Sequence, residues 1–179
     1  LIFLSIFEIK FKQIIMKKSN NLKVAIVMGS QSDAKTMALC TKVLKNFGIK
    51  FETKIISAHR TPKRMYEFAQ TAEKNKFGVI IAGAGGSAHL PGMISSLTSI
   101  PVLGVPIESK NLNGLDSLLS IVQMPKGIPV GTLAIGDNGA INAGLLAVSI
   151  IANTSSAVKK KLNNWRKLQT KSVKRKPKF

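Results

Sequence analysis

The two histidines of the chain stand beside groups that bind anions, which indicates proton transfer on a negatively charged ligand. His59 directly precedes Arg60 in the segment Ser57-Ala58-His59-Arg60. An imidazole titrates near neutrality, so His59 is a candidate general acid and base. The guanidinium of Arg60 is a candidate clamp for a phosphate or a carboxylate. The alternative interpretation is a solvated loop pair with no chemical role.

The second histidine, His89, follows the glycine-rich segment Gly83-Ala-Gly-Gly-Ser-Ala88. This segment fits the dinucleotide pattern G-x-G-x-x-A, but it follows the third predicted strand rather than the first, and Pro91 interrupts the helix that should run on. We prefer a pocket in which the glycine backbone approaches a planar ring closely and helix-leading amides hold a carboxylate. His89 is then either part of the chemistry or a helix-end histidine bonded to a neighbouring carbonyl.

A third polar segment, Gly29-Ser30-Gln31-Ser32-Asp33, joins an apolar strand to a helix. Free backbone N–H groups at such a turn, together with the two serine hydroxyls, bind a phosphate, and Asp33 is placed to accept hydrogen bonds from sugar hydroxyls. The alternative is ordinary helix capping, because Ser and Asp are preferred at the N-cap of any helix.

Short apolar runs alternate with helical segments, which predicts an α/β fold with a parallel sheet covered on both faces. The carboxyl ends of parallel strands meet at one edge, so the three polar segments should converge there. We expect strands at 23–28, 51–56, 78–82, 101–105 and 130–135, and helices at 33–47, 62–75, 88–98, 113–123, 139–152 and 156–171.

The net charge of +19 is concentrated at the ends of the chain. Residues 159–179 contain ten basic and no acidic residues, whereas residues 24–158 have a net charge of +5. Lysine outnumbers arginine, 23 to four, although nucleic-acid recognition favours the arginine fork, so we expect no specific nucleic-acid partner. Binding of the basic tail to a polyanion is a second hypothesis.

The remaining composition predicts a single domain without a metal or an organic cofactor. Cys40 is the only cysteine and falls among apolar helical positions, which favours a small buried side chain. We expect a leader over 1–21, one catalytic domain over 22–170 and a disordered basic tail over 171–179. We interpret residues 1–15 as upstream sequence and Met16 as the start. No stretch has the length of a membrane span or the pattern of an export signal, so we expect a cytoplasmic protein.

Four motifs together resemble the AIR carboxylase (phosphoribosylaminoimidazole carboxylase) family of de novo purine synthesis, over about residues 22–170. They stand in the family's order at 24–33, 57–62, 82–93 and 120–132. The class that uses free carbon dioxide looks like Ser-Ala-His-Lys-Gly-Pro where this chain has Arg60-Thr61-Pro62, which favours the bacterial-type mutase class. Ser87 departs from the family pattern, which usually has Ala there.

The resemblance implies a flavodoxin-like three-layer α/β/α sandwich with a five-stranded parallel sheet, assembled as a homo-octamer. It implies an isomerase that converts the small-molecule substrate N5-carboxyaminoimidazole ribonucleotide to 4-carboxy-5-aminoimidazole ribonucleotide. The proton-transfer residue is His59. The substrate-binding residues are Ser30, Ser32, Asp33, Ser57, Ala58, Arg60, Gly83, Gly85, Gly86, His89 and Leu90.

Two other functions fit the same residues. One is the carboxylase that adds free carbon dioxide to 5-aminoimidazole ribonucleotide. The other is a non-enzymatic, flavodoxin-like nucleotide-binding module with a polyanion-binding tail, which predicts RNA affinity with a steep salt dependence.

Overall fold

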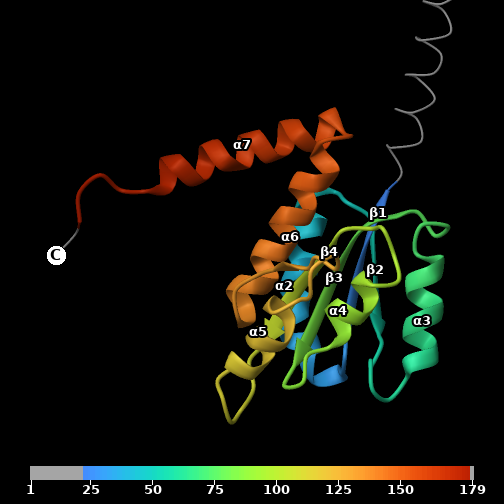
Figure 1. Cartoon of the computed structure of the whole chain (residues 1–179). Coiled ribbons are helices and arrows are strands. Elements are labelled where there is room, and N and C mark those ends of the chain that lie inside the picture. The colour runs from blue at the N-terminus through green and yellow to red at the C-terminus, as the bar shows by residue number, and fades with distance from the viewer. Residues whose placement is uncertain (1–21, 178–179) are drawn as a thin grey trace, which may run out of the picture.

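The computed structural model describes residues 22–177 and contains one five-stranded parallel sheet (Figure 1). The strands are β1 (Lys23–Met28), β2 (Phe51–Ile55), β3 (Phe77–Gly85), β4 (Val102–Ile107) and β5 (Gly131–Thr132), in the order β2-β1-β3-β4-β5. That order is the flavodoxin-like one, and it reverses between β1 and β3. The fold class predicted from the sequence is therefore confirmed.

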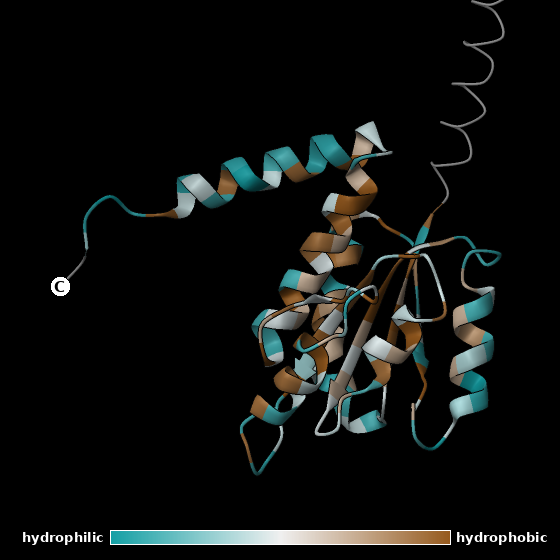
Figure 2. Ribbon diagram, viewed as in Figure 1, coloured by the Kyte–Doolittle hydropathy of each residue, from teal (hydrophilic) through white to brown (hydrophobic). Residues whose placement is uncertain are grey.

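Helices cover both faces of the sheet and make three layers. One face packs against α2 (Ala34–Phe47) and α6 (Gly136–Ala152), and the other against α3 (Pro62–Thr71), α4 (Leu90–Ser95) and α5 (Leu115–Val122). Strand β1 alternates between them: Ile26 is buried with α2 and α6, and Val27 with α3 and α4. Figure 2 shows the resulting concentration of hydrophobic residues on the strands and on α6.

The helices α2 and α6 pack closely enough to bury Cys40 completely. Its Sγ donates a hydrogen bond to the carbonyl of Ala140 at 3.0 Å, and burial raises the pKa of the thiol to about 12. Gly144 of α6 permits this approach, since a Cβ there would lie 2.9 Å from the Cβ of Val43. The prediction that Cys40 is a small buried side chain is confirmed.

Several predicted boundaries were wrong, most notably the end of β3. The glycine run was expected to end that strand at 82, but pairing continues with Ala84 opposite Pro106 and Gly85 opposite Ile107. Pairing with a neighbouring strand outweighs the low strand propensity of glycine. Residues 86–89 then form tight turns, so α4 begins at Leu90 rather than 88. The predicted strand 130–135 is reduced to the two residues of β5.

The last helix, α7 (Ser156–Ser172), contacts the body through its first half and projects away from it (Figure 1). Leu162 is buried, and the ring of Trp165 meets the ring of Phe47 edge to face at 6.3 Å between centroids. Residues 166–177 are all exposed. Trp165 thus anchors the helix on its own chain. The predicted leader over 1–21 and the Met16 start lie outside the described residues, and disorder of the basic tail stays a prediction.

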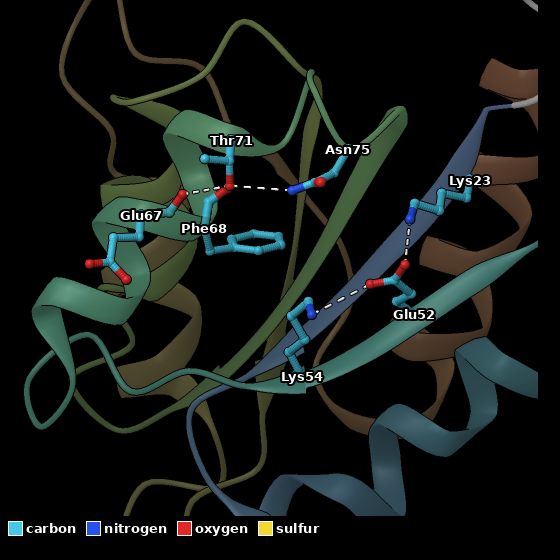
Figure 3. A network of polar contacts seen from close by, with 7 residues as sticks. All are labelled: Lys23, Glu52, Lys54, Glu67, Phe68, Thr71 and Asn75. Atoms are coloured by element: carbon cyan, nitrogen blue, oxygen red, sulfur yellow. Dashed lines mark hydrogen bonds and ion pairs between the residues drawn. The ribbon is translucent and has the colours of Figure 1, made fainter.

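Charged side chains occupy the outer edge strand, β2 (Figure 3). Glu52 pairs with Lys23 of β1 and, at 3.4 Å, with Lys54. On α3, Thr71 donates to the carbonyl of Glu67 at 2.7 Å. Charges on an edge strand oppose pairing with another sheet.

Among the helices between residues 22 and 177, none has both the length and the apolar character required to cross a bilayer.

Candidate functional site

The predicted site residues converge on one cavity of about 470 Å³ at the carboxyl ends of β1, β2, β3 and β4. Such a volume suits a small organic ligand. All but one of these residues line it: His59, Ser30, Ser32, Asp33, Ser57, Ala58, Arg60, Gly85, Gly86, His89 and Leu90.

The two histidines meet in this cavity. Nε2 of His59 lies 2.8 Å from Nδ1 of His89, with the ring planes 85° apart. A hydrogen bond between two imidazole nitrogens requires that one carry the proton and the other accept it. The pair therefore holds a proton that can be transferred, at the carboxyl edge of the sheet. The expectation that His89 bonds a neighbouring carbonyl is not met, because its ring partner is His59.

Arg60 joins two of the converging loops. Its Nη2 donates to the carbonyl of Gly29 at 3.0 Å, and its Nε donates to Oγ of Ser57 at 3.2 Å. A guanidinium has five N–H donors, so after these two contacts three are left to bind an anion. Since Arg60 and His59 are adjacent in sequence, the same loop presents both a guanidinium and an imidazole to the cavity.

The loop that carries His59 is held in place by Thr61. Thr61 occupies the N-cap of α3, but its hydroxyl makes no capping bond. The hydroxyl instead donates to the carbonyl of Ser57 and accepts from the N–H of Ser57, both at 3.0 Å. Both ends of the Ser57 backbone are thereby fixed, which sets the position of the following histidine.

The turn between β1 and α2 forms a capping box rather than a set of free donors. Asp33 Oδ2 accepts from the N–H of Ser30 at 3.0 Å, and Ser30 Oγ accepts from the N–H of Ser32 at 3.3 Å. The N–H of Gly29 donates to the carbonyl of Gly83. The expectation of free amides is wrong for Gly29, Ser30 and Ser32, because a backbone carbonyl satisfies the first and polar side chains of the turn satisfy the other two. What the turn offers to the cavity is the hydroxyls of Ser30 and Ser32.

Asp33 is almost fully buried, with 7% of its surface exposed. Burial is the main influence on its carboxyl and raises its pKa above 3.8, although hydrogen bonds from Ser32, Ser30 and Gly29 and the charge of Arg60 oppose the shift. The folded protein therefore binds this proton more tightly than the unfolded chain does. By linkage, the free energy of unfolding contributed by Asp33 falls as the pH rises through this range.

We expect the substitution Asp33→Asn to remove this pH dependence. The stability of the wild type relative to the variant should fall as the pH rises above about 4, as measured by urea unfolding. Asp116→Asn is the matched control with the opposite sign, because a hydrogen bond from Ser109 lowers the pKa of Asp116. A wild type that gains stability over Asp33→Asn as the pH rises would contradict the assignment.

Gly83 is the one predicted site residue that does not line the cavity. It lies within β3, where a Cβ would come within 2.4 Å of Sδ of Met37. The glycine is required by the packing of α2 on the sheet. From the sequence alone this glycine suggests ligand binding. Packing and ligand binding both favour glycine, because a residue without a side chain lets other atoms come close to the backbone.

Six lining residues are absent from the predicted set: Gly29, Ala84, Ser87, Ile107, Glu108 and Ser109. The last three lie at the end of β4: Ile107 is its final residue, and Glu108 and Ser109 come directly after it. Strand β4 ends beside β3 at the same edge of the sheet. A signal was present, because the polar pair Glu108-Ser109 directly follows an apolar strand, as Ser57 and the Gly29 turn follow theirs. Glu108 adds a carboxylate to the lining of the cavity.

The site combines a hydrogen-bonded histidine pair, an arginine, hydroxyls and a glycine-rich wall. This set suits acid and base chemistry on a ring that carries an anionic group. Among residues 22–177, no three His, Cys, Asp or Glu side chains form a group able to hold a metal ion.

Comparisons with known proteins agree with this chemistry. The model of the family described as AIR carboxylase matches residues 23–172. The N5-carboxyaminoimidazole ribonucleotide mutase of Brucella melitensis is 57% identical over 157 residues, which cover 88% of this chain and 97% of that protein. The enzyme of the same name from Escherichia coli K12 is 54% identical, over 87% of this chain and 92% of that protein. The crystal structure of Treponema denticola PurE superposes with a TM-score of 0.75 at 26% identity, over 83% of this chain and 91% of that one.

Proposed function

The chain belongs to the AIR carboxylase family, and on that premise we propose that it is an N5-carboxyaminoimidazole ribonucleotide mutase of purine biosynthesis. This isomerase moves a carboxylate from the exocyclic nitrogen of its substrate to the ring carbon C4. The observation that carries the proposal is the contact between His59 and His89, 2.8 Å apart, in the cavity that Arg60 also lines.

We assign the two ends of the substrate to the two sides of the cavity. The phosphate and ribose lie toward Arg60, Ser30, Ser32 and Asp33, because the guanidinium and hydroxyl groups there donate to anions and the carboxylate accepts from sugar hydroxyls. The imidazole ring and its carboxylate lie toward His59 and the glycine-rich wall, lined by Ser57, Ala58, Gly85, Gly86, His89 and Leu90.

One histidine, His59, can both donate and remove the proton that the reaction transfers. The bond between the exocyclic nitrogen and the carboxylate carbon breaks, and His59 donates a proton to that nitrogen. The released carbon dioxide forms a bond to C4, which then carries both a hydrogen and a carboxylate. His59 removes that proton, which restores the aromatic ring and regenerates the acid. No electrons change hands, so the step requires no redox carrier.

Holding the carbon dioxide is the second requirement. The gas must stay beside C4 until it recombines, so the cavity must hold both fragments close together and exclude water. Leu90 and Ala58, both buried, supply apolar surface beside the histidines. Gly85 and Gly86 have no side chains and so leave room against the backbone for a planar ring.

Isotope tracing tests the function. Purified protein is given the ribonucleotide with a ¹³C-labelled carbamate in unlabelled bicarbonate, and separately 5-aminoimidazole ribonucleotide with bicarbonate. We expect the label to appear in the ring carboxylate without dilution in the first reaction. Product formed only in the second reaction would identify the carboxylase that uses free carbon dioxide. No product in either, with salt-sensitive RNA binding, would indicate the nucleotide-binding module.

We also propose a homo-octamer as the assembled form. Support comes from α5 and the turn before it, where Leu112, Leu115, Leu119 and Val122 are all exposed. An apolar row of this kind is suited to contact with another copy of the chain. Light scattering coupled to size exclusion measures the mass of the assembly. A cytoplasmic location stays a prediction of the sequence.

A further inference from the structure

Ser117, on α5, has no exposed surface and does not line the cavity. Its hydroxyl donates to the carbonyl of Ile107 at 2.7 Å and accepts from the N–H of Gly86 at 2.9 Å. Ile107 ends β4, and Gly86 directly follows β3. One buried hydroxyl thus joins the ends of two neighbouring strands at the rim of the site.

The carbonyl of Gly86 is bonded as well. It accepts from the N–H of Ala88 at 2.8 Å and, at 3.3 Å, from Oγ of Ser120, one turn further along α5, whose shorter bond goes to the carbonyl of Asp116 at 2.7 Å. Gly86 has a φ of +67°, in the left-handed region that favours glycine. Ser117 therefore holds the N–H of Gly86, while Ala88 and Ser120 hold its carbonyl.

This anchor is connected directly to the histidine pair. From Gly86 the chain makes two tight turns, in which the N–H of His89 donates to the carbonyl of Ser87 at 2.9 Å. These turns place His89 at the N-cap of α4, from which Nδ1 reaches Nε2 of His59. Only Ser87 and Ala88 lie between Gly86 and His89, so a displacement of Gly86 displaces His89.

The first turn of α5 is itself braced. Oδ1 of Asp116 accepts from the hydroxyl of Ser109 at 2.7 Å and from the N–H of Ser117 at 2.9 Å, and Oγ of Ser109 accepts from the N–H of Gly114 at 3.1 Å. These bonds fix the loop between β4 and α5 to the start of the helix. The hydroxyl of Ser117 therefore has a rigid support on one side and the glycine-rich loop on the other.

We propose that Ser117 is a positioning residue that acts through Gly86 to hold His89 in contact with His59. The inference rests on the proposed mutase function and extends it to a residue outside the cavity. Ser117 bonds neither Arg60 nor the turn over Gly29–Asp33, so it controls the proton-transfer end of the site and leaves the phosphate end alone. Its loss should therefore lower kcat and leave KM nearly unchanged.

The test compares Ser117→Ala with Ser117→Thr, which keeps the hydroxyl, and with Ser95→Ala. Ser95 also makes a bond between elements, from Oγ to the carbonyl of Pro129 at 2.7 Å, but it lies at the end of α4 away from the cavity. We expect Ser117→Ala to lower kcat about tenfold with KM within about twofold, because small displacements of reacting groups are costly. Ser117→Thr should recover most of kcat, and Ser95→Ala should match the wild type.

Amide hydrogen exchange gives a readout that does not depend on activity. In Ser117→Ala the N–H of Gly86 loses its buried acceptor, so a peptide covering 84–90 should exchange faster while peptides from β1 stay protected. Should Ser117→Ala fail to fold, Ser120→Ala removes the second bond to Gly86 and should give the same pattern with a smaller loss of kcat. An active wild type with unchanged kcat and exchange in the variants would overturn the inference, whereas an inactive wild type would overturn the proposed function.

Discussion

Replacing His59 by asparagine is expected to lower kcat by about 100-fold or more, the usual contribution of a general acid and base. KM should change by no more than about threefold, because His59 is assigned to proton transfer and Arg60 to binding the phosphate. The asparagine amide can still donate a hydrogen bond toward His89, so the contact across the cavity is not simply lost. Steady-state kinetics with the carbamate substrate measure both constants.

The interpretation depends on a properly folded variant that still binds. Calorimetric titration with the product ribonucleotide should give a dissociation constant close to that of the wild type, and the unfolding transition should be unchanged. Because the chain has only two histidines and both lie in the site, the ring signals of His89 can be followed in the variant by NMR without overlap from others. Turnover near the wild-type rate would refute the assignment of His59.

Replacing Arg60 by alanine is expected to raise KM by about 30-fold, equivalent to a loss of about 2 kcal/mol for a charge-assisted contact with phosphate. The effect has two sources. The variant loses the donors that face the anion, and it loses the bonds to Gly29 and Ser57 that hold two loops together. Since the proposed function assigns the reacting ring to the side of His59 and the glycine-rich wall, kcat should fall only a few-fold.

Arg64→Ala is the matched control for Arg60→Ala. Arg64 lies one turn further along, on α3, and donates to the carbonyl of Ile55 at 3.3 Å, but it does not line the cavity. Both variants remove one positive charge from the same region of the surface. An equal rise of KM in the two would show that net charge, rather than a direct contact by Arg60, governs binding.

The convergence of the site was predictable because it follows from the direction of the strands. Residues 29–33, 57–60 and 83–89 each follow an apolar run, and parallel strands place all such segments at one edge. Local pattern was sufficient for this inference. It was also sufficient for Cys40, because apolar neighbours at helical spacing leave few other places for that side chain.

The features that were predicted wrongly or left open depend on contacts between residues far apart in the sequence. Gly83 packs against Met37, and the extension of β3 depends on pairing with β4, which no local propensity encodes. The His59–His89 contact joins residues 30 positions apart, so the sequence left the partner of His89 open. Ser117 had no visible signal at all, because a buried serine on an amphipathic helix looks like any other small residue.

The edge-to-face stacking of Trp165 on Phe47 gives the chain a built-in optical reporter. No other indole occurs in the sequence, so intrinsic tryptophan emission reports on a single place, the seam between the projecting terminal helix and the body. A change in that emission signals that α7 has detached from the body of the protein. An activity assay reports instead on the site at the carboxyl edge of the sheet. Detachment of the terminal helix and loss of catalysis can therefore be followed as separate events in one sample.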